Sequence, residues 1–178
     1  HGHIMSLLDK HVDYIFYPCM PYNFDEGISD NNYNCPVVAY YPELLAANIP
    51  GLKQTRFLTP YMGLHRPKDF KHRSARYFHK EMGIDFSEVG FAVDLAYKAY
   101  EKWHRSIVSA GERMIEEARL KGSSILVLCG RPYHIDPEIS HGIDELCAEY
   151  GFVILSEDAL SDRLKKEKRT VLNQWTYQ

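Results

Sequence analysis

The segment between residues 130 and 141 combines a turn, a cation and one imidazole directly before a predicted helix, with a second imidazole inside that helix. Gly130 follows an apolar run, and Asp136-Pro137 is a strong helix start. Free N–H groups at a helix start attract anions, and an arginine can hold a phosphate or carboxylate with two hydrogen bonds. We therefore expect a substrate- or anion-binding site here. Its candidate residues are Arg131, Tyr133, His134, Asp136 and His141.

A structural turn is the competing interpretation of this segment. Arg131 would then pair with Glu138 or Asp158, and His134 would be solvated. The segment matches neither the Walker A loop nor the GxGxxG fingerprint, so nucleotide binding is not specifically indicated. His65-Arg66 also follows a predicted strand and could join an anion site, although a surface turn is the simpler interpretation.

Two cysteines beside prolines are candidate metal ligands. Cys19 follows Pro18 and Cys35 precedes Pro36, each where a predicted strand meets a loop. Thiolates there could bind an iron–sulfur cluster or a soft metal, but a cluster usually needs three or four ligands. In a parallel sheet, the two thiols would also lie at opposite edges unless the long loop between them folds back. Buried, inert thiols are the alternative.

Strands and helices must hold these residues at one edge of a sheet. Short apolar runs predict strands over 13–18, 36–40, 56–60, 124–129 and 152–156, with a long loop over 19–34. Helical spacing predicts helices over 42–47, 67–82, 88–120 and 137–150. The apolar run 124–129 is typical of a strand buried on both faces. The order of predicted elements over 124–156 is typical of a right-handed βαβ crossover. We therefore predict an α/β fold with a mostly parallel, doubly wound, Rossmann- or flavodoxin-like sheet of about four to five strands and flanking helices.

Composition limits the function further. The chain has 178 residues and a net charge of −3, which argues against a nucleic-acid or anionic-membrane binder. It shows no signal peptide and no apolar run near the length of a membrane span. Four cysteines without a CxxC pair indicate reduced thiols and a cytoplasmic protein. We interpret residues 1–5 as a cloning remnant, 6–160 as the α/β domain, and 161–178 as the truncated helical start of a following segment.

Several spaced segments form a set that is specific only when taken together. They are Phe16–Cys19, Asn34–Val38, Tyr41–Glu43, Gly130–His134, Asp136–Glu138, His141-Gly142 and Asn173–Tyr177. The set resembles the large activator-related proteins of 2-hydroxyacyl-CoA dehydratases. In that family, a domain similar to the dehydratase iron–sulfur subunit is joined to an ATP-hydrolysing activase.

The resemblance implies a fragment that takes part in low-potential electron transfer to an acyl-CoA system in anaerobic metabolism. It implies Cys19 and Cys35 as ligands of an iron–sulfur cluster in the full-length protein, with the remaining ligands outside this chain. It also implies an activase module, in the same or another chain, and an acyl-CoA as partners. Without the ATP-binding module, we expect this fragment alone to be inactive. The alternatives are a non-catalytic α/β module that binds a small anion or a partner domain, and a structural scaffold between activase domains.

Overall fold

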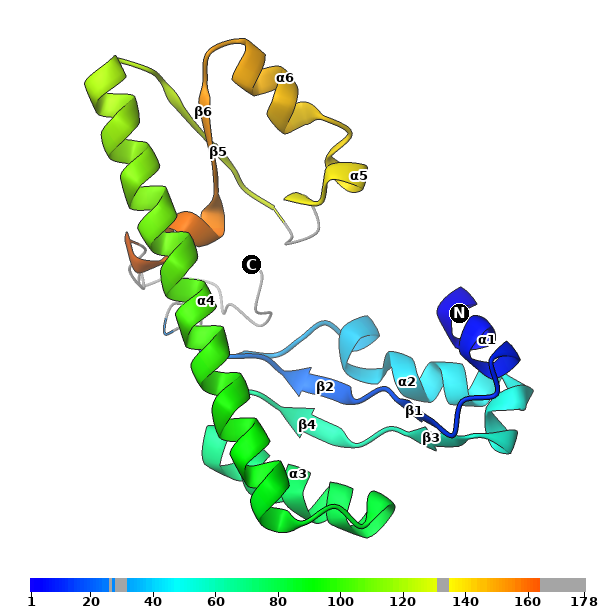
Figure 1. The fold of residues 1–178 in the computed structure, drawn as a ribbon. Coiled ribbons are helices and arrows are strands. Elements are labelled where there is room, and N and C mark those ends of the chain that lie inside the picture. Colours follow the sequence, from blue (N-terminus) through cyan, green and yellow to red (C-terminus); the bar gives the residue numbers. More distant parts are fainter. Residues whose placement is uncertain (26, 28–31, 131–134, 164–178) are drawn as a thin grey trace, which may run out of the picture. The chain divides into compact units, whose positions relative to one another are not determined.

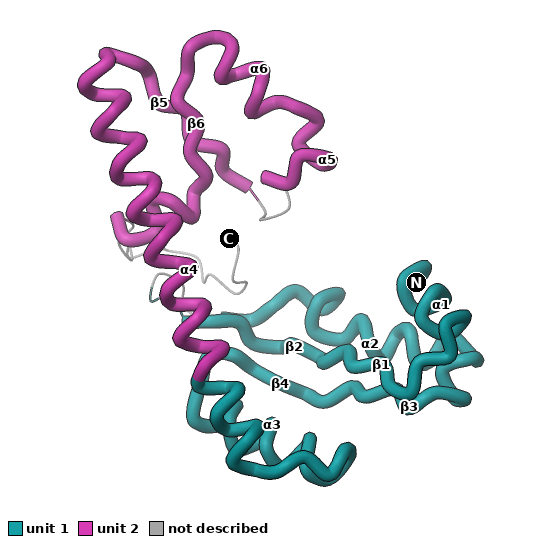
Figure 2. Tube along the Cα trace, in the orientation of Figure 1, with its two compact units in different colours: residues 1–94, 167–176, 178 teal, residues 95–166, 177 magenta. Residues whose placement is uncertain are grey.

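The structure, a computed structural model, describes residues 1–25, 27, 32–130 and 135–163. In this part of the chain there are two compact units, unit 1 over residues 1–94 and unit 2 over residues 95–163 (Figure 2). Both units combine helices with short parallel strands, which confirms the α/β class. Three of the candidate site residues, Arg131, Tyr133 and His134, lie outside the described residues.

Unit 1 contains two parallel strand pairs. Strand β1 (Tyr14–Phe16) pairs with β3 (Arg56–Leu58), and β2 (Cys19–Tyr22) pairs with β4 (Tyr61–Gly63) (Figure 1). Backbone hydrogen bonds of 2.9 Å from Tyr17 to Leu58 and from Cys19 to Pro60 connect the two pairs. The pairs therefore form one parallel ribbon, interrupted at Pro18 and Pro60, where no N–H is available for pairing. The predicted loop over 19–34 is wrong at its start, because the extended chain continues past Pro18.

Helix α2 (Pro36–Asn48) occupies a segment whose first residues we predicted to be a strand. Cys35 is the N-cap residue, and Pro36 stands in the first turn, where its fixed φ suits a helix and its missing N–H is not needed. Pro42, which we expected to start the helix, lies inside it. The strand prediction over 36–40 is wrong, because a short apolar run does not by itself distinguish a strand from a helix.

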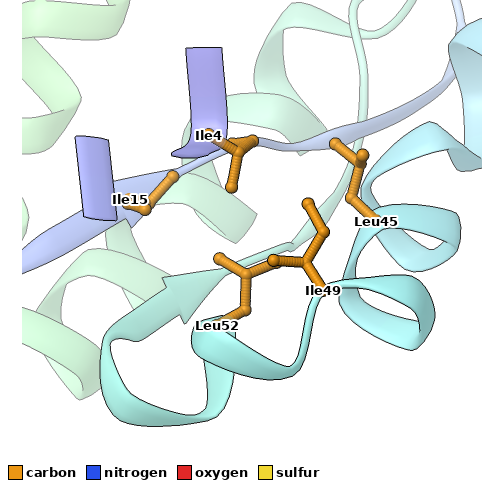
Figure 3. Close-up of a cluster of buried hydrophobic side chains, with 5 residues drawn as sticks. All are labelled: Ile4, Ile15, Leu45, Ile49 and Leu52. Carbon is orange, nitrogen blue, oxygen red and sulfur yellow. The ribbon is translucent and has the colours of Figure 1, made fainter. Parts of the chain in front are cut away.

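The core of unit 1 lies where α2, β1, the short 3₁₀ helix η1 (Pro50–Gln54) and α1 (Gly2–Asp9) meet (Figure 3). Its buried side chains are Ile4, Ile15, Leu45, Ile49 and Leu52. Ile4 belongs to the residues that we interpreted as a cloning remnant, and in the structure its side chain contributes to this core.

Two long helices agree closely with the sequence predictions. They are α3 (Pro67–Met82) and α4 (Phe86–Lys121), of which residues 86–94 belong to unit 1. Gly83 ends α3 with a φ of 71°, and its N–H donates to His79. Asp85 caps α4 by accepting a hydrogen bond from the Ser87 N–H at 2.7 Å. None of the described helices is long and apolar enough to cross a membrane.

Unit 2 contains one parallel strand pair, β5 (Ile125–Leu128) with β6 (Val153–Ser156), together with residues 95–121 of α4. The parallel pairing confirms the predicted order of strand, helical segment and strand. The helical segment is broken, however, into α5 (Pro137–Ser140) and α6 (Ile143–Glu149), because His141 and Gly142 both adopt left-handed conformations. A 3₁₀ helix, η3 (Glu157–Arg163), follows β6.

The sheet differs from the one that we predicted. The described strands form three two-stranded parallel sheets, whereas we expected one doubly wound sheet of four to five strands. Strand β5 is also only partly covered, and its first residue, Ile125, is exposed. In the described part of the chain β5 pairs only with β6, so its continuous apolar sequence does not correspond to burial on both faces.

Candidate functional site

The described residues of the predicted 130–141 site are Asp136 and His141, which lie at opposite ends of α5. The Asp136 carboxylate accepts hydrogen bonds from the N–H groups of Glu138 at 2.9 Å and Ile139 at 3.3 Å. The chain's own carboxylate therefore occupies the helix start that we expected to hold an anion. His141 is in a left-handed turn, with φ 53°, and not inside a helix as we predicted. The five-residue site stays a prediction.

Unit 1 holds a pocket of about 370 Å³ at the carboxyl ends of β2 and β4. Such ends are where open parallel α/β structures bind ligands, because the loops that follow the strands gather there. The loop after β4 leads directly into α3. The residues with chemistry in the wall are Tyr22, Tyr61, His65, Arg66, Asp69 and Arg73.

The rings of Tyr22 and His65 form part of the wall of this pocket. The His65 and Tyr22 rings have centroids 4.5 Å apart, and the Tyr22 and Tyr33 rings 4.8 Å apart. Gly63 permits the approach of His65, because a Cβ at position 63 would lie 3.0 Å from the His65 Nδ1. That Nδ1 is buried and has no hydrogen-bond partner among the described residues. A buried polar atom without a partner costs about 1–3 kcal/mol, so a ligand that bonds to it would gain affinity.

Positive charge forms the other side of the pocket. Arg66 is the N-cap residue of α3, whose 16 residues direct their positive dipole end towards the same loop. Arg66 forms no ion pair with any other described residue, whereas Arg73 binds the Asp69 carboxylate at 3.0 Å. The arrangement favours an anionic group over a neutral or cationic one. His65 and Arg66, for which a surface turn was the simpler interpretation, both line the pocket.

Sequence reasoning missed Tyr22, Tyr61, Asp69 and Arg73 as pocket residues. Tyr22 and Tyr61 belong to β2 and β4, which we did not predict, and Arg73 lies in the second turn of a helix that gave no other sign of function. One signal in the sequence could have indicated the pocket. Residues 63–67, at the end of a strand, contain a glycine, a histidine, an arginine and a proline in that order. The turn at 130–137, where we predicted the site, has the same types of residue between a strand and a helix.

Cys19 begins β2 and is wholly buried. Burial raises the pKa of its thiol, and so does the nearby Glu43 carboxylate, while a hydrogen bond from the Glu43 backbone lowers it by less. Tyr61, opposite Cys19 in the strand register, donates to Glu43, and this hydrogen bond raises the pKa of Tyr61 to about 12. Cys19 therefore stays a protonated thiol at neutral pH.

Cys35 lies near the other end of β2. The chain after the loop folds back, because Asn34 donates from its backbone to Pro21 at 2.9 Å and from its side chain to Met20 at 2.8 Å. Glu43, which interacts with Cys19, is eight residues further along α2 than Cys35, or about 12 Å of helix. In the described part of the chain, no group of three or more His, Cys, Asp or Glu could hold a metal ion. The described residues do not form a complete cluster site, and ligation by Cys19 and Cys35 stays a prediction.

We expect the four cysteines to react with iodoacetamide at very different rates. Cys129 is exposed and should react first, whereas Cys19 should react last, because its thiol is buried and its raised pKa lowers the fraction of reactive thiolate. Timed alkylation at pH 7.5, read by peptide mass spectrometry, measures the rates. Unfolding the protein in guanidinium chloride should bring the rates together. Rapid labelling of Cys19 in the folded protein would contradict its placement in β2.

Comparison with known proteins gives one match. A family model described as "CoA enzyme activase uncharacterised domain" matches residues 1–160. Searches of curated proteins and of solved structures found no match. The matched range includes the whole pocket, both candidate cluster ligands and the strand pair of unit 2.

Proposed function

This chain belongs to the CoA enzyme activase uncharacterised domain family, and we propose that it is a binding module whose pocket at the carboxyl ends of β2 and β4 takes a small anionic ligand. The membership confirms the expected relation to activators of CoA-linked enzymes. The membership does not distinguish the dehydratase-related hypothesis from the non-catalytic one. An activase module and an acyl-CoA are the partners that we propose for the complete system.

The observation that carries the proposal is the buried His65 Nδ1 without a partner among the described residues, beside Arg66 and the start of α3. In the tautomer with its proton on Nδ1, the imidazole donates to an anionic oxygen. Arg66 is available for a second, charged hydrogen bond. The volume of about 370 Å³ suits a small molecule. Phosphate groups, which an acyl-CoA carries, have the charge and the acceptor atoms that this wall requires.

We expect Arg66→Gln to weaken the binding of inorganic phosphate at least about tenfold, because a hydrogen bond to a charged group contributes about 1.5–3 kcal/mol. Arg73→Gln should also weaken binding, but by less, since Asp69 already neutralises part of its charge. Amide chemical shifts in a phosphate titration, followed by NMR at constant ionic strength, give the dissociation constants.

Lys68→Gln is the matched control for both variants. Lys68 lies on α3, its substitution removes the same charge, and it does not line the pocket. The dissociation constant of phosphate from the Lys68→Gln protein should stay within about twofold of the wild-type value. Equal losses of affinity in the Lys68 and Arg66 variants would mean that the phosphate responds to net charge alone, and would overturn the proposed site.

Iron–sulfur electron transfer is a separate proposal, supported by the family's link to CoA enzyme activation and by Cys19 and Cys35. It requires further ligands from outside the described residues. Anaerobic reconstitution of a longer polypeptide should incorporate less iron after the double substitution Cys19→Ser and Cys35→Ser. Iron content and paramagnetic resonance spectra provide the measurement, and an unchanged iron content would reject these two ligands.

A further inference from the structure

The pocket in unit 1 has an apolar part as well as the charged part that holds the anion. Pro21, Met62 and Phe70 line it, together with the rings of Tyr22 and Tyr61. A phosphate ion is hydrated on all sides and gains nothing from contact with such side chains. An apolar group that leaves water there is stabilised roughly in proportion to the area that it buries. The apolar part therefore favours a ligand that carries more than an anionic group.

Phe70 brings apolar surface next to the proposed anion position. Arg66, Phe70 and Arg73 are spaced by four and three residues at the start of α3, so they share one face of the helix. The Phe70 N–H donates to the Arg66 carbonyl oxygen at 2.9 Å, which places the two residues one turn apart. Four residues of helix rise about 6 Å. Because both residues line the same pocket, a group attached directly to an anion at Arg66 is within reach of the Phe70 ring.

Asp69 weighs against a second anionic group in the ligand. Its carboxylate lies in the same wall and binds Arg73 at 3.0 Å, so the charge of Arg73 is partly neutralised. A second anionic group beyond Arg66 would approach this carboxylate, and like charges repel each other. The pocket volume of about 370 Å³ nevertheless lies in the range of pockets that enclose a whole small molecule. The space that an anion at Arg66 leaves free therefore suits an uncharged, apolar group.

We infer that the ligand of this pocket is a phosphate monoester whose alcohol part is apolar, with an aromatic ring as the best fit. Its phosphate group lies between His65 and Arg66, and its apolar group contacts the Phe70 ring. Aromatic rings pair favourably when they are offset or edge to face, and the rings of Tyr22 and Tyr61 stand in the same wall. This inference rests on the proposed function, because it uses the same pocket and the same anion position. It adds that Phe70 selects among phosphate esters.

The test compares inorganic phosphate, glycerol phosphate and phenyl phosphate by isothermal titration calorimetry at constant ionic strength. At about pH 8.5 all three are dianions, so they differ in the group attached to the phosphate and not in charge. We expect phenyl phosphate to bind about tenfold more tightly than glycerol phosphate. Arg66→Gln should weaken the binding of all three anions by a similar factor and keep this ratio.

Phe70→Ala should bring the affinities for phenyl phosphate and glycerol phosphate to within about twofold of each other. Phe78→Ala is the matched control, because Phe78 lies about two turns further along α3, contacts Phe16 and Tyr77, and does not line the pocket. The Phe78→Ala protein should keep the ratio at about tenfold. If Phe70→Ala does not fold, Phe70→Leu, which keeps an apolar side chain but removes the ring, should lower the ratio to about threefold.

The outcomes separate the inference from the function on which it rests. If phosphate binds and Arg66→Gln weakens it, but phenyl phosphate binds no more tightly than glycerol phosphate, the apolar ligand class is wrong and the proposed anion pocket remains. If none of the three anions binds at millimolar concentration, the pocket itself is wrong and the inference fails with it. A preference for phenyl phosphate as large in Phe70→Ala as in Phe78→Ala would also overturn the inference, because the ring of the ligand would then bind elsewhere.

Discussion

Replacing Leu45 with alanine should lower the free energy of unfolding of unit 1 by about 2–5 kcal/mol, the range for a leucine truncated in a packed core. Leu45 is 4% exposed and packs with Ile4, Ile15, Ile49 and Leu52. Ile4, Ile15 and Leu52 belong to α1, β1 and η1, and Ile49 lies between α2 and η1. A cavity at Leu45 therefore weakens the packing between these four elements. Guanidinium unfolding followed by circular dichroism, with amide exchange in α2 and β1, measures the loss.

Leu44 provides the control for this substitution. It is the same residue type in the same helix, one position earlier, but it is 55% exposed. Leu44→Ala should change stability by no more than about 0.5 kcal/mol, as surface substitutions usually do. Equal losses of unfolding free energy in the two variants would show that α2 is rotated about its axis from its position in the structure. The positions of Cys35 and Glu43 next to β2 would then be wrong as well.

Long helices were the part of this fold that the sequence predicted best. Apolar residues recur at helical spacing through α3 and α4, and local signals mark their limits, including Gly83 after α3 and Asp85 before α4. These signals depend on residues close together in the chain. Such local signals do not depend on contacts with distant parts of the chain. The predicted limits 67–82 and 88–120 therefore differ little from the observed ones.

The strands were harder to predict, because each is only three or four residues long. Their pairing depends on partners more than 25 residues away, such as Arg56 for Tyr14. Proline was misleading in both directions: Pro18 interrupts an extended segment without ending it, and Pro36 starts a helix within an apolar run. Periodicity over such short stretches does not determine the secondary structure, and the number of strands in a sheet is not encoded locally.

The sequence suggested the local arrangement of the candidate site but placed the site in another part of the chain. We expected an anion site after a strand and before a helix, and the pocket in unit 1 has this arrangement at His65 and Arg66. The sequence favoured 130–141 because its helix start is chemically stronger. In the structure Asp136 itself accepts hydrogen bonds from that helix start, whereas Arg66, the N-cap residue of α3, makes no side-chain cap hydrogen bond. The unpaired His65 Nδ1 depends on packing against Tyr22 and Gly63, which no local pattern reveals.

Unit 2 depends on a close approach between α4 and η3, which involves Gly111. A Cβ at Gly111 would lie 2.7 Å from the Ala159 carbonyl oxygen and 2.8 Å from the Ala159 Cβ. Next to this contact, Arg163 donates to Glu112 at 2.7 Å, and the Ser161 hydroxyl lies 3.1 Å from the His104 Nε2. Only a residue without a side chain lets the backbone of η3 reach the helix here. The glycine is therefore needed for packing, although glycine is a poor helix former.

Gly111→Ala should consequently destabilise unit 2 by up to about 2 kcal/mol, because forcing Ala159 away costs about 1–3 kcal/mol and alanine recovers only roughly 1 kcal/mol over glycine in a helix. Gly90 lies in the same helix, within unit 1, and a Cβ there would meet only the flexible end of Lys71 at 3.0 Å. Gly90→Ala should therefore leave stability unchanged or raise it by up to about 1 kcal/mol. Thermal unfolding with amide exchange in η3 and β6 measures both variants. A Gly111→Ala protein as stable as the Gly90→Ala protein would show that η3 does not pack against α4 at this position, and the contacts of Glu112 and His104 with η3 would be wrong with it.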